Sequence, residues 1–80
     1  MESKWVDLVN DRLKLILEEA IFDERTEQIF KWHYGVECQR LDLKAISKGV
    51  KMPIKKLKLE VVKIDNKVFN ILKKHNFLEE

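Results

Sequence analysis

The apolar residues of this chain recur three or four positions apart along most of its length, and this spacing strongly constrains the fold. An α-helix has about 3.6 residues per turn, so the spacing places apolar side chains on one helical face, whereas a half-buried strand needs strict alternation. The 80 residues include only two glycines and one proline, which disfavours a turn-rich β fold. We therefore expect an all-α fold of four to five helices, in a single domain over residues 1–80.

Two amphipathic helices are expected in the first half of the chain. The first runs from Trp5 to Ile21. Its buried stripe comprises Trp5, Val9, Leu13, Ile16, Leu17 and Ala20. Asp23 has the side chain of an N-cap, and the second helix should run from there to about Tyr34. Gly35 can end this helix in the left-handed conformation because it has no Cβ atom, and the polar stretch 36–41 should form a loop.

The second half predicts a short helix, a tight turn and a long helix. Asp42 can cap the short helix. The buried positions of that helix are Leu43, Ile46 and Val50. Pro53 is tolerated at the first position of a helix and keeps the preceding residue non-helical, so Lys51 and Met52 should form the turn. The last helix then continues almost to His75, with Asp65 and Asn66 as poor helix formers within it.

The segment from about residue 42 to about residue 64 therefore has the layout of a helix-turn-helix. In this motif the first helix braces the second, whose exposed N-terminal residues reach the major groove of DNA. Ser47 is the candidate small residue at the helix crossing, and Met52 is the candidate apolar residue of the turn. Leu57 and Val61 would anchor the second helix. The exposed residues at its start would be Ile54, Lys55, Lys58, Leu59 and Val62.

The charges divide between the two halves of the chain. Residues 1–40 carry six basic and nine acidic side chains, whereas residues 41–80 carry ten lysines and five acids. Lysine neutralises phosphate and can donate to guanine, so double-stranded DNA is the expected partner of the second half. The predicted DNA-binding residues are Lys48, Lys51, Lys55, Lys56, Lys58 and Lys63. The alternative is that these lysines form the solvated face of a structural or protein-binding bundle.

Three segments of the chain resemble region 4 of bacterial sigma-70-type factors. The run 21–35, which ends in His-Tyr-Gly, is similar to the start of that region, and 64–73 is similar to its closing pattern. The residues that match the family's helix-turn-helix are Leu43, Ile46, Met52 and Leu57. The resemblance covers roughly residues 12–74. It implies a helix-turn-helix domain with a basic helix toward DNA and an apolar patch that docks on the flap of RNA polymerase.

The sequence also departs from the family pattern. Pro53 stands where the family usually has a serine, and His33 replaces the arginine before Tyr34 and Gly35. Lysines and aliphatic residues replace the family's arginine and glutamate readers. A rival hypothesis is therefore a protein-interaction module that binds RNA polymerase or a sigma factor, or forms a homodimer, without reading DNA. The aliphatic residues Leu59 and Val62 favour that hypothesis.

We expect no enzyme, and hence no catalytic residue, cofactor or metal site. The sequence has no glycine-rich phosphate loop, no metal-ligand spacing and no nucleophile with an evident base. The single Cys38 excludes an internal disulfide and favours a reducing, cytoplasmic setting. No apolar run approaches the roughly 18 residues of a membrane span.

The aromatic residues and the histidines are assigned to structural roles. The aromatic residues expected in the core are Trp5, Phe22, Phe30, Trp32 and Phe69. His33 is expected to be a partly buried helix residue, and His75 an exposed residue of the C-terminal tail.

Overall fold

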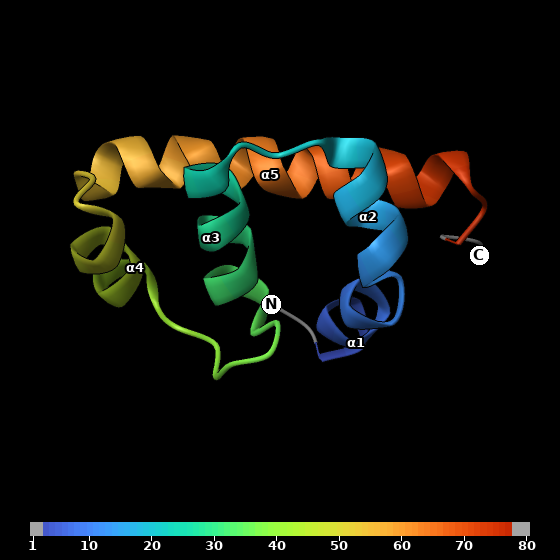
Figure 1. Cartoon of the computed structure of the whole chain (residues 1–80), viewed down its shortest axis with the longest axis horizontal. Helices are drawn as coiled ribbons and strands as arrows, with labels where there is room; N and C mark the ends of the chain where they lie inside the picture. The colour runs from blue at the N-terminus through green and yellow to red at the C-terminus, as the bar shows by residue number, and fades with distance from the viewer. Residues whose placement is uncertain (1–2, 78–80) are drawn as a thin grey trace.

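The computed structural model describes residues 3–77, and within that range it contains five helices and no strand. The helices are α1 (Ser3–Asp11), α2 (Leu13–Ala20), α3 (Glu24–Tyr34), α4 (Leu43–Val50) and α5 (Ile54–Lys74). Figure 1 shows α5 running along the molecule with the other four helices on one side of it. A 21-residue helix is about 31 Å long, close to the longest dimension of 36 Å. The predicted all-α fold is confirmed.

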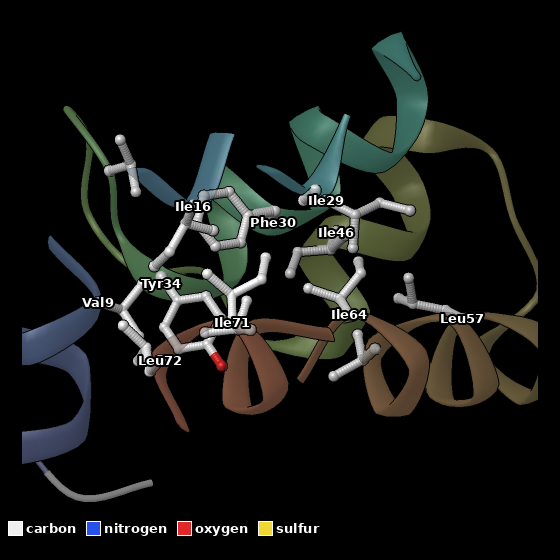
Figure 2. Packing of buried hydrophobic residues seen from close by; sticks show 14 of the residues in the cluster. Val9, Ile16, Ile29, Phe30, Tyr34, Ile46, Leu57, Ile64, Ile71 and Leu72 are labelled. Atoms are coloured by element: carbon white, nitrogen blue, oxygen red, sulfur yellow. The ribbon is translucent and has the colours of Figure 1, made fainter. Parts of the chain in front are cut away.

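The hydrophobic core lies between α5 and the helices beneath it (Figure 2). The residues that α5 buries are Leu57, Val61, Ile64, Val68, Ile71 and Leu72. Against them pack fully buried side chains from the other helices, including Ile16, Ile29, Phe30 and Ile46. Full burial of one such side chain contributes about 1.5–3 kcal/mol to the free energy of folding. The contacts between α5 and the other helices therefore contribute much of the stability of the fold.

The prediction of one helix from Trp5 to Ile21 is wrong, because the chain bends at Arg12. Arg12 has φ −110° and ψ 24°, outside the helical region. Hydrogen bonds of 3.0 Å from Arg12 N–H to Leu8 O and from Ile16 N–H to Arg12 O continue across the bend. The bend lets α1 pack against α3 while α2 packs against α5, which one straight helix would not allow.

Side-chain caps begin α3 and α4 as predicted. A carboxylate oxygen of Asp23 accepts a hydrogen bond of 2.8 Å from Thr26 N–H, and Asp42 accepts one of the same length from Ala45 N–H. The hydrogen bond from the Thr26 backbone lowers the pKa of Asp23. Gly35 ends α3 at φ 68°, the left-handed conformation expected of it. Local sequence therefore sets the boundaries of these helices.

A partly buried hydrogen-bonded chain links α1, α3 and α5. Trp5 Nε1–H donates to the Tyr34 hydroxyl at 3.0 Å, and that hydroxyl donates to Asp65 Oδ1 at 2.6 Å. Burial is the largest cause that raises the pKa of Tyr34, and the hydrogen bond to Asp65 is the second. The hydroxyl is therefore a donor at neutral pH. His33 Nε2 lies 3.3 Å from the same Asp65 oxygen but is buried without a hydrogen bond in the described part of the chain.

Two side-chain predictions are wrong, whereas the prediction of one long final helix is confirmed. Phe69 is 46% exposed, with its ring centroid 6.4 Å from that of Trp5, whereas Phe30 is fully buried as expected. His75 is half-buried and contacts Glu19 Oε2 through Nε2 at 2.8 Å, because α2 ends beside the last turn of α5. This contact is the main reason that the pKa of Glu19 is lowered. Helix α5 continues unbroken through residues 65–66.

Candidate nucleic-acid interface

The turn between α4 and α5 is fixed by Ser47. Its carbonyl accepts hydrogen bonds from the N–H groups of Lys51 and Met52, and its hydroxyl donates to the Met52 carbonyl. Lys51 adopts the left-handed conformation with φ 56°. Pro53 is the N-cap of α5 and Ile54 its first residue, so the helix begins one position later than predicted. The unit 42–64 thus comprises α4, a three-residue turn and the first half of α5.

The close approach of α4 to α3 depends on Gly49. A Cβ atom at this position would lie 2.5 Å from Cζ3 of Trp32, so only glycine fits against the indole ring without a shift. The sequence interpretation assigned the small crossing residue to Ser47, which instead holds the turn. The available signal was the isolated glycine inside an otherwise helical pattern, which often marks close packing.

The predicted anchors of α5 are buried and its predicted outer residues are exposed. Leu57 is fully buried, Val61 is 9% exposed and the turn residue Met52 is 6% exposed. The exposed positions at the start of α5 are Ile54, Lys55, Lys58, Leu59 and Val62. Since the anchors pack α5 against α3 and α4, the N-terminal half of α5 presents its opposite face to solvent.

All six lysines predicted to bind DNA are exposed: Lys48, Lys51, Lys55, Lys56, Lys58 and Lys63. Within residues 3–77, no ion pair joins the first five to a carboxylate. Lys63 lies 3.6 Å from Glu60 and its side chain is still 75% exposed. These ammonium groups are therefore available to an external anion.

The six lysines form rows rather than a single cluster. Lys55 and Lys58 are one helical turn apart on α5, whereas Lys56 and Lys63 lie two turns apart on an adjacent face. On α4, Lys48 and the missed residue Lys44 lie four positions apart, on the side opposite the buried Ile46. The i, i+4 spacing of two lysines in a capped helix was the signal that could have identified Lys44.

The N-terminus of α5 lacks the side-chain cap that begins α3 and α4. Pro53 provides no capping side chain, and the first turn of α5 contains no acidic residue. Lys55 and Lys56 occupy that turn instead, where the helix dipole disfavours positive charge by about 0.3–1 kcal/mol per group. A helix end with exposed N–H groups and lysines is suited to binding phosphate.

Other kinds of site find no support in the described residues. Residues 3–77 contain no group of three or more His, Cys, Asp or Glu side chains arranged to hold a metal ion. Over the same range, no helix has the length and apolar character needed to cross a bilayer. Comparisons found no matching protein-family model, no matching curated protein and no matching solved structure.

Proposed function

We propose that this chain is a small transcription regulator, similar to sigma region 4, that binds double-stranded DNA through the lysine-rich start of α5. The observation that carries the proposal is the first turn of α5. Two lysines occupy it, although both Asp23 and Asp42 cap their helices in the usual way. A sequence selected for stability alone would favour an acidic or capping residue at this position.

Each group of lysines has a distinct role in the proposed complex. Lys55 and Lys58, on the outer face of α5, approach the major groove and bind the phosphates at its edge, while Lys48 and Lys51 bind the phosphate backbone beside it. Lys56 and Lys63 extend the phosphate contact along the flank of α5. Leu59 and Val62 offer no hydrogen bond to a base and contact at most a thymine methyl. Affinity therefore depends mainly on phosphate, with modest discrimination between sequences.

Fluorescence anisotropy with a labelled 20-base-pair duplex at low salt tests this proposal. The double substitution Lys55→Glu with Lys58→Glu should weaken binding by at least tenfold, because it replaces two attractive contacts with two repulsive ones. The matched control is Lys4→Glu with Lys14→Glu, which changes net charge equally on α1 and α2. These helices lie at the end of the molecule away from α4 (Figure 1), so the control should retain most of the affinity.

Two results would oppose DNA binding by α5. The first is no detectable duplex binding at low salt by the unsubstituted chain. The second is an equal loss of affinity in both double variants, which would indicate attraction by net charge alone.

A second candidate function is a protein-interaction module that binds RNA polymerase or a sigma factor, or forms a homodimer. The specific observation in its favour is the exposure of Leu59 and Val62, at 64% and 55%. Pull-down with purified core polymerase and purified sigma factor, together with sedimentation of the chain alone, separates this candidate from DNA binding. Retention on either protein, or a dimer, combined with no duplex affinity would favour it.

A further inference from the structure

One side of α5 is not covered by another helix (Figure 1), and α5 exposes an apolar stripe whose C-terminal residue, Phe69, lies beside Trp5 of α1 with ring centroids 6.4 Å apart. Leu59, Val62 and Phe69 are 64%, 55% and 46% exposed, and the exposed Asn66 lies between the last two. Steps of three, four and three residues join these four positions, which is the spacing of the seam between two paired helices. The stripe spans eleven residues, so its ends are about 15 Å apart along the helix.

Lysines lie at both ends of this stripe and along both edges, although beside Phe69 the edge that carries Lys58 continues with Asp65 and with Trp5 of α1. Lys55 and Lys73 lie at its two ends, Lys56 and Lys63 along one edge, and Lys58 along the other. All five of these side chains are exposed.

The two carboxylates within α5 do not offset these lysines fully. Glu60 is paired with Lys63 at 3.6 Å, and Asp65 accepts a hydrogen bond from the Tyr34 hydroxyl, so two negative charges stand against the five lysines. The stripe therefore has an apolar centre and a positively charged border.

From this arrangement we infer that the stripe binds an amphipathic helix of a partner protein that is apolar along its seam and acidic along both edges. Apolar partner residues would remove Leu59, Val62 and Phe69 from water, and carboxylates would meet the surrounding lysines. About three helical turns of the partner suffice to cover the stripe. A polar residue opposite Asn66 would fix the register, as buried Asn does in paired helices.

Charge distinguishes this partner from a second copy of the chain. Two α5 helices paired through the stripe, in either direction, would bring the edge lysines of one copy close to those of the other. Like charges at these flanking positions oppose association. Duplex DNA satisfies the lysines but presents hydrated phosphate rather than apolar surface to most of the stripe.

The inferred binding surface overlaps the proposed DNA-binding surface at Lys55, Lys58 and Leu59. An acidic partner helix and DNA would therefore compete for the start of α5. The inference rests on the exposed apolar stripe, so it stands or fails independently of DNA binding.

The test uses a fluorescein-labelled 21-residue helical peptide as the probe. Its heptads carry leucine at both seam positions, except for one central asparagine, and glutamate at the edges. We expect the full chain to bind this peptide and Leu59→Ser with Val62→Ser to weaken binding by about tenfold. Circular dichroism should be unchanged because both side chains are exposed.

A matched substitution and a matched peptide serve as controls. Ile21→Ser also removes an exposed aliphatic side chain, 82% exposed and outside α5, and should leave peptide binding unchanged. A peptide with lysine in place of every glutamate should not bind.

Three results would overturn the inference. One is no binding of the acidic peptide, and a second is binding that Leu59→Ser with Val62→Ser does not weaken. The third is a dimer of the chain in sedimentation that the same double variant abolishes, which would make a second copy the occupant.

Discussion

At the scale of single residues, the most strained position is Ile21. It ends α2 in the left-handed conformation at φ 50° and is 82% exposed. That conformation costs a residue with a Cβ atom roughly 1–2 kcal/mol, and isoleucine is β-branched as well. Little packing at Ile21 offsets this cost.

We expect Ile21→Gly to stabilise the chain. Removing the left-handed strain outweighs the greater flexibility of glycine in the unfolded state, for a net gain of about 0.5–1 kcal/mol in the free energy of unfolding. Urea denaturation followed by circular dichroism measures the change. Ile21→Ala, which keeps a Cβ atom, is the control and should gain less. A lower stability for the glycine variant than for the alanine variant would show that the backbone strain is not the dominant effect.

At the scale of elements, acidic residues in place of the lysines at the start of α5 should raise the stability of the fold, although they should weaken DNA binding. Lys55→Glu with Lys56→Glu should raise the free energy of unfolding by about 1 kcal/mol, because acidic groups interact favourably with a helix N-terminus. Lys73→Glu is the control at the other end of α5, where the same charge change should destabilise by about 0.3–1 kcal/mol. Thermal denaturation at low ionic strength compares the two. If Lys55→Glu with Lys56→Glu lowered stability, the lysines at this end would have a structural role.

The Asp23 cap of α3 contributes stability at neutral pH that should be lost at acid pH. The pKa of Asp23 is lowered by the Thr26 backbone N–H, so the folded state binds the carboxylate proton more weakly than the unfolded state does. This contribution is present above the usual pKa of an aspartate and is lost as pH falls through the lower folded pKa. Asp23→Asn should leave stability near pH 7 almost unchanged, because asparagine caps a helix about equally well.

Denaturation midpoints measured from pH 7 to pH 3 test this prediction. The Asp23→Asn variant should lose less stability than the parent chain over the acid part of this range. Parallel curves for the two proteins would indicate that the Asp23 carboxylate contributes nothing beyond its role as a hydrogen-bond acceptor.

At the scale of the whole molecule, the Trp5–Tyr34–Asp65 chain joins helices that are distant in sequence. Tyr34→Phe keeps the buried ring and removes the hydroxyl, which leaves Trp5 Nε1–H and Asp65 without this partner. We expect a loss of about 1–2 kcal/mol in the free energy of unfolding, since one of the bonds involves a carboxylate. Urea denaturation should show a lower midpoint with an unchanged m-value. A midpoint within error of the parent would show that water replaces the hydroxyl at no cost.

Features set by neighbouring residues could be predicted from the sequence, whereas features set by contacts across the molecule could not. Asp23, Gly35 and Asp42 act on the nearest turn of backbone, and their roles followed from residue type and spacing. The exposure of Phe69 and the bend at Arg12 depend on which helices meet, and the helical period carries no such information.

The same distinction applies to the candidate interface. The exposure of five of the six lysines followed from the periodicity of α4 and α5, because each of these side chains lies away from the buried stripe of its own helix; the sixth, Lys51, lies in the turn. The contact of Gly49 with Trp32 joins two helices and appeared only in the structure. The hydrogen bond between Tyr34 and Asp65 likewise links residues on α3 and α5 that no local pattern brings together.

The most direct test of DNA binding by α5 is the salt dependence of duplex affinity for the parent chain and for Lys55→Ala with Lys58→Ala. Each phosphate contact contributes a slope of about 0.9 to the plot of log affinity against log salt concentration. If Lys55 and Lys58 each neutralise one phosphate, the double variant should bind more weakly at low salt, with a slope shallower by about 1.8. An equal slope for the two proteins, or no duplex binding by the parent chain at low salt, would contradict DNA binding through α5.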